Sequence, residues 1–286
     1  MENIQLKLTD HADSVKAFFR HFSLRERMPQ RLFLQEILEK FAALPYENIS
    51  KIIKLNQTWE TPQKRFRFPE ELFEQHLAHK LGGTCFSLTY YLKAILEKNG
   101  FPCYPVMADM RAGKNIHCAL VVILDGMSYL VDPGYLLSQP LEMGSAKRKM
   151  YKTEFAGVEL CYDATTNWFH LYTFNNGKTT WRYRFRNRPV HTEEFLHHWQ
   201  TSFNGNSMHN ICLTKVHKNG LLYIREAFMR ETTFDEKRNF NIKKNYHQTI
   251  FERFGIEKEI VERAQTALGE NLSEEKRRGL WVPKGS

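Results

Sequence analysis

A long apolar segment followed by a tight-turn signal constrains the fold of this chain more than any other feature. Residues 116–124 read Ile-His-Cys-Ala-Leu-Val-Val-Ile-Leu, an apolar run long enough for a buried strand. Asp125-Gly126, a pair preferred in two-residue hairpin turns, follows directly, and residues 127–132 have the pattern of a returning strand. The segment therefore predicts an antiparallel β-hairpin whose pairing is set by its turn.

The predicted pairing brings a histidine and an aspartate together. With the turn at residues 125–126, Ala119 lies opposite Asp132, and His117 projects from the same face as Ala119. His117 and Asp132 are then diagonal neighbours, within reach of side chains of their length. A bulge or a loop of odd length would change this register. A carboxylate beside an imidazole fixes the tautomer of the ring and stabilises its protonated form, so the hairpin predicts a base with its orienting residue.

A cysteine at the start of a predicted helix is a candidate nucleophile that such a base would activate. Cys85 follows residues 82–84, Gly-Gly-Thr, in which the glycines permit a tight turn and the threonine is a common N-cap. Apolar residues recur after Cys85 at helical spacing until Asn99-Gly100 ends the pattern. Unpaired N–H groups at a helix start favour a thiolate. Cys85, His117 and Asp132 therefore form a candidate Cys-His-Asp triad, with the division of labour seen in papain-like folds.

Further segments accompany these residues in a fixed order. Residues 44–49 read Leu-Pro-Tyr-Glu-Asn-Ile, residues 82–86 read Gly-Gly-Thr-Cys-Phe, and residues 129–135 read Tyr-Leu-Val-Asp-Pro-Gly-Tyr. Residues 251–256, Phe-Glu-Arg-Phe-Gly-Ile, form a late phenylalanine-glycine turn. Across nearly its whole length the chain resembles the arylamine N-acetyltransferase family, whose signatures include Pro-Phe-Glu-Asn-Leu, Arg-Gly-Gly-x-Cys-Phe, a histidine strand and Val-Asp-x-Gly-Phe.

The resemblance implies an α+β fold in a papain-like, or cysteine-proteinase-like, arrangement of N-terminal helical bundle, central β-barrel and C-terminal α/β lid. Residues 1–84 carry mostly helical spacing and lead to the nucleophile helix. Residues 85–190 hold that helix and short runs of period two, which indicate the barrel with its His/Asp hairpin. Residues 191–286 mix both patterns and are assigned to the lid and C-terminal helices. The spacing predicts helices at residues 13–22, 30–44, 72–77, 192–199, 246–254 and 258–268.

The resemblance also implies a reaction. The chain would be an acetyl-CoA-dependent N-acetyltransferase with a ping-pong mechanism, in which Cys85 takes the acetyl group as a thioester. An amine of the arylamine or arylhydrazine type would then attack the thioester, with His117 as base and Asp132 holding His117. The backbone N–H of Cys85 would help to bind the oxyanion. The partners implied are acetyl-CoA as acyl donor and a small-molecule amine acceptor, without a metal.

Substrate contacts follow from the same resemblance. Tyr135, Tyr46 and Phe86 are candidate substrate-binding residues. Residues 202–207, Ser-Phe-Asn-Gly-Asn-Ser, are similar to a loop that contacts coenzyme A in the family, which makes Asn204 and Ser207 candidate cofactor-binding residues. An ordinary buried aromatic residue is the alternative interpretation of Tyr135, and a surface turn is the alternative for the polar segment.

Four motif positions depart from the family pattern. Leu81 stands where an arginine usually precedes the glycine pair, and Ser87 and Thr89 replace the Glu and Asn of a Glu-Leu-Asn segment. Pro133 stands where a small or aliphatic residue is usual. We expect the changes at positions 81, 87 and 89 to remove an ion pair or hydrogen bonds around the nucleophile helix, which affects the choice of acceptor more than the acyl-transfer chemistry. Two alternative functions stay open. One is a papain-like hydrolase or amide-forming relative with the same triad, and the other is a weakly active homologue that binds acyl-CoA or a small aromatic molecule.

Composition excludes several other classes of protein. With 286 residues, of which 42% are hydrophobic, the chain is long enough for a large core. It has neither an apolar run of about 18 residues nor a signal-peptide pattern, so we expect a cytoplasmic protein that does not span a membrane. Five cysteines without a Cys-x-x-Cys pair favour reduced thiols and argue against structural zinc. The histidine spacing fits no metal template either.

The net charge and an alternating aromatic–arginine segment give further expectations about ligands and strands. The formal net charge of +9 would suit the phosphates of acetyl-CoA. Residues 181–188 alternate aromatic residues with arginines, which a barrel strand with its aromatic residues inside explains better than a nucleic-acid surface. Cys118 lies on the strand face opposite His117, so we expect it to lie outside the site. No pattern in the sequence predicts an oligomeric state.

Overall fold

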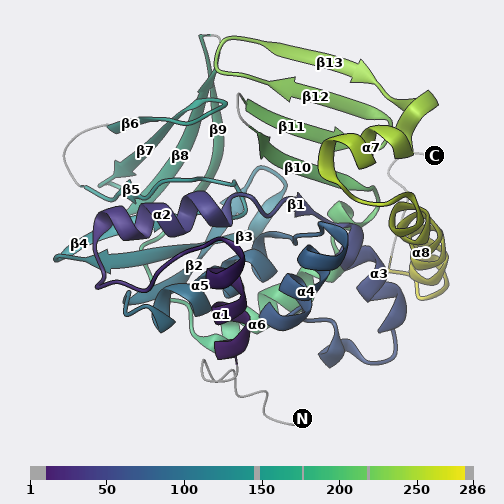
Figure 1. Cartoon of the computed structure of the whole chain (residues 1–286), viewed down its shortest axis with the longest axis horizontal. Helices are drawn as coiled ribbons and strands as arrows, with labels where there is room; N and C mark the ends of the chain where they lie inside the picture. Colours follow the sequence, from purple (N-terminus) through teal and green to yellow (C-terminus); the bar gives the residue numbers. More distant parts are fainter. Residues whose placement is uncertain (1–10, 145–148, 176, 218–219, 281–286) are drawn as a thin grey trace.

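In the part of the chain that the structure describes, N-terminal helices pack on an eight-stranded antiparallel sheet that curls into a barrel, and a five-stranded antiparallel sheet follows with C-terminal helices (Figure 1). The computed structural model describes residues 11–144, 149–175, 177–217 and 220–280. This architecture confirms the predicted α+β class. Among the described residues, no helix combines the length and apolar character needed to cross a bilayer.

The helices before the barrel bury an aromatic core. They are α1 (Ala12–His21), α2 (Arg31–Phe41), α3 (Ile49–Gln57), α4 (Pro69–His79) and α5 (Cys85–Lys98). Leu88, Tyr91 and Leu92 of α5 are fully buried in the cluster that α1 and α2 also line. The predicted helices at 13–22, 30–44 and 72–77 correspond to α1, α2 and α4, whereas α3 was not assigned from the sequence.

The curved sheet has the strand order β5-β4-β3-β2-β9-β8-β7-β6. Its strands are β2 (Cys103–Met110), β3 (Gly113–Leu124), β4 (Met127–Val131), β5 (Leu141–Glu142), β6 (Lys149–Lys152), β7 (Gly157–Asp163), β8 (Trp168–Asn175) and β9 (Lys178–Phe185). Tyr183 and Phe185 of β9 are buried in the barrel core, as the alternation predicts. The prediction is wrong for Trp181, because the register shifts between Leu171 and Tyr172. Trp181 is only partly buried and donates a hydrogen bond to His170.

The β3–β4 hairpin has the register that its turn predicts. Leu124 pairs with Met127, and the ladder continues to the pair of Leu120 with Val131. Asp125 has a φ of 51° and Gly126 a φ of 74°, the positive values that a tight turn of this hand requires. Asp132 directly follows β4, so the hairpin brings it close to His117, which lies within β3.

The C-terminal part combines the five-stranded sheet, which we call the lid sheet, with helices. Its strand order is β1-β10-β11-β12-β13, so β1 (Tyr46–Glu47) from the N-terminal region joins strands from the end of the chain. The other strands are β10 (Cys212–His217), β11 (Gly220–Arg225), β12 (Phe228–Thr232) and β13 (Lys237–Asn241). The sheet therefore ties the segment before the nucleophile helix to the lid (Figure 1).

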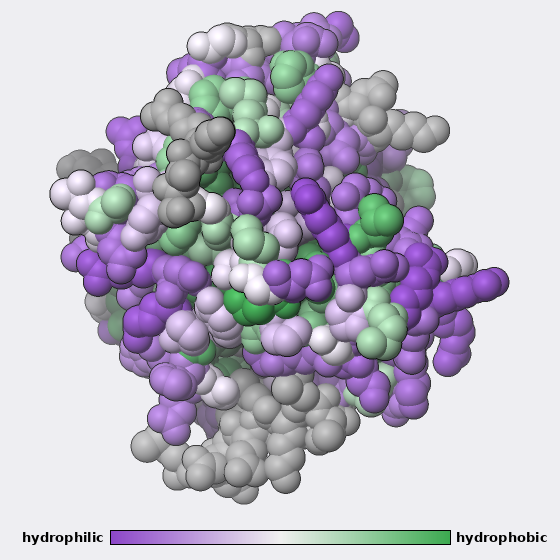
Figure 2. Space-filling model, turned by 90° about the vertical axis from the view of Figure 1, so that its left-hand side faces the viewer, coloured by the Kyte–Doolittle hydropathy of each residue, from purple (hydrophilic) through white to green (hydrophobic). Residues whose placement is uncertain are grey.

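The helices of this part are α6 (Thr192–Thr201), α7 (Tyr246–Phe254) and α8 (Lys258–Arg277), with short 3₁₀ turns at Ser202–Asn204 and Asn206–Met208. The predicted helix at 246–254 is confirmed. The predicted end of the last helix at residue 268 is wrong, because Gly269, which resembles a stop signal, lies inside α8. The division of the chain at residues 84 and 190 stays a prediction. Figure 2 shows the side on which β4 and β6 lie, where hydrophilic residues surround small apolar areas.

Candidate active site

Cys85 is the first residue of α5, and close packing of the preceding turn fixes its place. A Cβ atom on Gly82 would lie 1.9 Å from the carbonyl oxygen of Pro45, so only glycine fits there. Thr84 occupies the N-cap position, but its side chain makes no capping hydrogen bond. Instead the Ser87 hydroxyl donates to the Thr84 carbonyl oxygen at 3.1 Å. Cys85 is only 7% exposed, so its thiol lies in a largely dry environment.

The predicted histidine–aspartate pair is present. Nε2 of His117 lies 2.8 Å from Oδ2 of Asp132. Asp132 is completely buried, and the same Oδ2 accepts a hydrogen bond of 2.6 Å from the Tyr183 hydroxyl. Its Oδ1 accepts the backbone N–H of Tyr135 at 3.0 Å. Asp132 is thus held by three donors, and Nδ1 is the ring nitrogen of His117 that remains available to Cys85, with which His117 also hydrogen-bonds.

Gly134 is the point at which the three candidate catalytic residues meet. A Cβ atom on Gly134 would lie 2.8 Å from Cε1 of His117, 2.9 Å from Cβ of Cys85 and 3.3 Å from Oδ1 of Asp132. Real Cβ atoms essentially never show contacts under 3.0 Å, so the three side chains converge only because residue 134 lacks a side chain. The structure therefore brings together residues from α5, β3 and the segment after β4.

The electrostatics of this cluster favour charge separation between thiol and imidazole. A hydrogen bond from Cys118 lowers the pKa of Cys85, burial opposes this, and His117 lowers it further, with a net pKa well below the usual value. Burial lowers the pKa of His117, but the charge and hydrogen bond of Asp132 together with Cys85 outweigh burial and raise it to about 10. The favoured state is a Cys85 thiolate beside a His117 imidazolium.

The expectation that Cys118 lies outside the site is wrong. Cys118 does project from the strand face opposite His117, but α5 packs on that face and carries Cys85. The Cys118 thiol therefore interacts with Cys85, as His117 also does, and both lower the pKa of Cys85. The Thr89 hydroxyl donates to the Cys118 carbonyl oxygen at 3.3 Å and links α5 to β3 at this point.

Comparison with known proteins identifies the family. A sequence model described as N-acetyltransferase matches residues 33–263. The chain belongs to the arylamine N-acetyltransferase family.

Curated members of the family align with part of the chain. Arylamine N-acetyltransferase 1 of Felis catus is 30% identical over 129 residues, which is 41% of this chain and 47% of the cat protein. Proansamycin X synthase of Amycolatopsis mediterranei is 27% identical over 128 residues, which is 39% of this chain and 49% of the synthase. The aligned part thus spans about half the length of these curated relatives.

Solved structures of arylamine N-acetyltransferases share the fold over a longer span. The enzyme from Mycobacterium abscessus superposes with a TM-score of 0.76 at 13% identity, over 89% of this chain and 94% of that one. An enzyme from Bacillus cereus superposes with a TM-score of 0.69 at 19% identity, over 86% of this chain and 99% of that one. The Bacillus cereus structure reveals a Cys-His-Glu catalytic triad.

A buried ion pair lies near the nucleophile helix, close to the motif departure at Leu81. Glu47 is completely buried, and its carboxylate accepts the backbone N–H of Gly82 at 3.2 Å. Nη1 of Arg67 lies 3.8 Å from Oε1 of Glu47 and donates to the Gly82 carbonyl oxygen at 2.9 Å. Arg67 supplies the cation of this pair. The expected loss of an ion pair or hydrogen bonds at positions 81, 87 and 89 stays a prediction. Sequence reasoning missed Arg67, because nothing in its neighbourhood along the chain points to Glu47.

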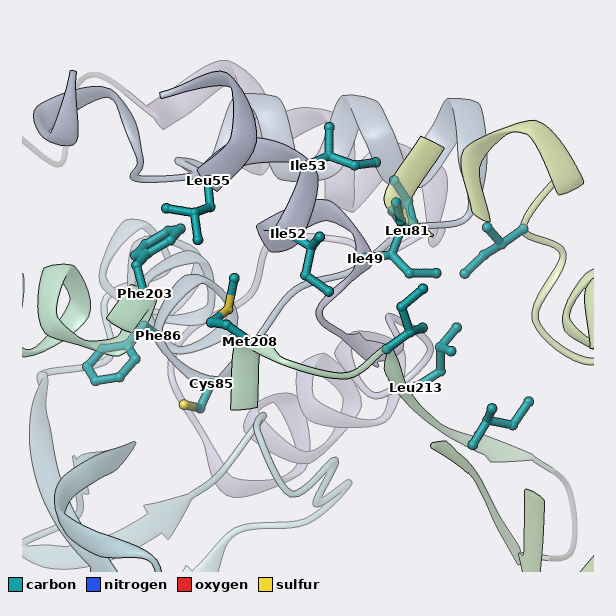
Figure 3. Close-up of a cluster of buried hydrophobic side chains, with 14 of the residues drawn as sticks. Ile49, Ile52, Ile53, Leu55, Leu81, Cys85, Phe86, Phe203, Met208 and Leu213 are labelled. Atoms are coloured by element: carbon teal, nitrogen blue, oxygen red, sulfur yellow. The ribbon is translucent and has the colours of Figure 1, made fainter. Parts of the chain in front are cut away.

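The candidate substrate-binding residues lie at different depths. The Tyr135 ring is 5.3 Å from the His117 ring in an edge arrangement, directly beside the proposed base. Tyr46 lies close enough to Cys85 for the thiol's charge to add to the effect of burial, and both raise the pKa of the Tyr46 hydroxyl. Phe86 is completely buried and packs on Phe195 at 5.5 Å, which places it in the core beside Cys85 (Figure 3).

The candidate coenzyme A residues lie on the two 3₁₀ turns. Asn204 and Ser207 are both exposed. The segment that carries them is fastened to the start of α3, because Nδ2 of Asn48 donates to the carbonyl oxygens of Ser207 at 2.8 Å and of Asn210 at 2.7 Å. A search of the described residues finds no group of three His, Cys, Asp or Glu side chains arranged for a metal ion.

Proposed function

We propose that this protein transfers an acetyl group from acetyl-CoA to an amine of the arylamine or arylhydrazine type through a thioester on Cys85. The observation that carries the proposal is the convergence of Cys85, His117 and Asp132 around Gly134. Membership of the family supports acyl transfer as the reaction class. In this proposal Asp132 takes the third place of the triad, in which the Bacillus cereus enzyme has a glutamate.

The first half of the reaction forms the acyl enzyme. The Cys85 thiolate attacks the thioester carbonyl of acetyl-CoA, and the tetrahedral oxyanion is positioned near the backbone N–H of Cys85 at the start of α5. The intermediate collapses by breaking the bond to the sulfur of coenzyme A. The His117 imidazolium gives its proton to that leaving thiolate and becomes neutral.

The second half uses the neutral imidazole as a base. The amine attacks the acetyl thioester, His117 takes the proton that the amine loses, and the Cys85 thiolate leaves. Asp132 stabilises the imidazolium that forms again, since its carboxylate is hydrogen-bonded to Nε2 of His117 at 2.8 Å. The products are the N-acetyl amine and the same thiolate–imidazolium pair with which the cycle began.

Intact-protein mass spectrometry after brief incubation with acetyl-CoA, without an amine, tests the proposal. We expect the wild-type chain to gain one acetyl group and the Cys85→Ala variant to gain none. Addition of an arylamine should then discharge the acetyl enzyme. If wild-type protein with an alkylatable Cys85 gains no acetyl group, acetyl-CoA is the wrong donor. The proposed function is then replaced by one of the alternatives, namely a hydrolase, an amide-forming enzyme or a weakly active homologue.

A further inference from the structure

In the described part of the chain, a buried lysine without a carboxylate partner contacts the hydrophobic cluster that contains the candidate nucleophile. Lys51 of α3 is 5% exposed. Its Nζ donates to the carbonyl oxygen of Ser202 at 2.9 Å and to the Ser202 hydroxyl at 2.7 Å, and it lies 4.6 Å from the centre of the Phe203 ring. Across the described ranges, no Asp or Glu forms an ion pair with Lys51.

A buried ammonium group that lacks a carboxylate is expensive to keep charged. Its surroundings are apolar, because Ile52 and Leu55 of α3, together with Phe203 and Met208, belong to the same buried cluster as Cys85 (Figure 3). The hydrogen bonds that Lys51 donates to the uncharged oxygens of Ser202 only partly replace the lost hydration. A counter-charge nearby would therefore stabilise Lys51.

The anion that meets this need is the nucleophile. Burial lowers the pKa of Lys51 to about 8, while the charges of Cys85 and Cys118 act against this change. In the opposite direction, Lys51 is among the groups that lower the pKa of Cys85, after Cys118 and His117. The neighbouring lysine of the same helix, Lys54, has a different environment, since it is only partly buried and pairs with Glu71 at 2.7 Å.

We propose that Lys51 is a positioning residue whose buried ammonium group, together with His117, holds Cys85 as a thiolate and fastens the Ser202–Asn204 turn beside it. The inference rests on the proposed function in that it takes Cys85 as the nucleophile. It adds a second cation, contributed by α3, which no family motif quoted above supplies. The same ammonium would stabilise the thiolate that leaves when the amine takes the acetyl group.

The other groups that face Cys85 determine what a change at Lys51 can alter. They are Tyr46 of β1, His117 and Cys118 of β3, and Asp132 and Tyr135 after β4. Asp132 is engaged by His117, and burial raises the pKa of both tyrosines, which keeps them neutral near pH 7. Lys51 and His117 are therefore the cations whose loss should raise the pKa of the thiol.

The test is the rate of Cys85 alkylation by iodoacetamide as a function of pH, followed by mass spectrometry of the modified peptide. Lys51→Met removes the charge at nearly constant length, and Lys51→Gln removes it but keeps a donor for Ser202. We expect both to shift the pH profile upward, with a loss of about tenfold in rate at low pH for each pKa unit. Lys51→Arg should restore the wild-type profile, and Lys54→Met should leave it unchanged.

A folded Lys51→Met or Lys51→Gln variant with the wild-type profile would overturn the inference. If neither variant folds, the inference is tested by comparing the pH titration of Lys51 in the wild type and in Cys85→Ala, followed by nuclear magnetic resonance of carbon-labelled lysine. Loss of the thiolate should make Lys51 titrate at lower pH than in the wild type, and an unchanged titration overturns the inference. Alkylation needs no acetyl-CoA, so failure of the donor assay with a shifted alkylation profile would refute the proposed donor alone.

Discussion

Addition of one methyl group at Gly134 should separate the proposed nucleophile from its base. In Gly134→Ala the new Cβ would lie 2.8 Å from Cε1 of His117 and 2.9 Å from Cβ of Cys85, whereas ordinary contact begins at 3.4 Å. The ring must therefore retreat by about 0.6 Å and the cysteine by about 0.5 Å, in directions that both lead away from Gly134. Both residues are more than nine-tenths buried, so they can move only by displacing neighbours.

These displacements set the expected size of the effect. Misplacement of reacting groups by about 1 Å lowers rates by about a hundredfold, so kcat/KM for acetyl transfer should fall by about that factor. Overpacking of a filled interior should also lower the free energy of unfolding by about 1–3 kcal/mol. The rate and stability effects have separate readouts, namely release of coenzyme A in the presence of an arylamine and urea unfolding followed by circular dichroism.

Gly269→Ala is the matched control, because a Cβ atom at that position meets nothing within 4 Å. Its activity should equal that of the wild type, and its stability should rise by up to about 1 kcal/mol, since alanine favours the interior of α8 over glycine. A folded Gly134→Ala variant with wild-type kcat/KM would refute the view that close approach at Gly134 assembles the reactive geometry.

Further substitutions test the surroundings of the site. Asp132→Asn should lower the pKa of His117 from about 10 and reduce alkylation of Cys85 at neutral pH by at least about tenfold. Wild-type Cys85 should lose reactivity only as the pH falls through its lowered thiol pKa. The pH profile of alkylation measures both effects. Tyr183→Phe removes the 2.6 Å hydrogen bond to Asp132 and should cost about 1–3 kcal/mol in urea unfolding, with a stability equal to the wild type contradicting a structural role for that bond. Arg67→Met leaves the Glu47 carboxylate buried without its cation, so thermal unfolding should show a loss of about 3–5 kcal/mol, and a loss below 1 kcal/mol would mean that Gly82 and Ser50 suffice.

Local sequence signals predicted the hairpin and its histidine–aspartate pair because every determinant lies within a few residues of the turn. Asp125-Gly126 adopts the positive φ values that the turn needs, and the two-residue period then decides which side chains share a face. The same logic placed Cys85 at the start of its helix. No long-range information was required for these parts of the site.

Residues contributed across long stretches of chain were not predictable in this way. Tyr183 reaches Asp132 from β9, and these residues are 51 positions apart in sequence. Lys51 reaches the Ser202 turn from α3, and these residues are 151 positions apart. Cys118 was misplaced for a related reason, since strand alternation gives its face correctly but says nothing about which helix packs there. Whether Cys118 lies near Cys85 depends on the docking of α5 against β3, a tertiary contact without a local sequence signal.

Arg67 and Glu47 form a buried ion pair beside the turn that carries the motif departure at Leu81. The buried Glu47 carboxylate needs donors wherever they come from, because an unpaired buried charge is costly. In this chain Gly82 and Ser50 supply backbone N–H groups, and Arg67 supplies the cation. Leu81 is then free to be apolar, and it joins the buried cluster that contains Cys85. The turn before Cys85 thus holds a satisfied buried carboxylate together with the departures at Leu81, Ser87 and Thr89.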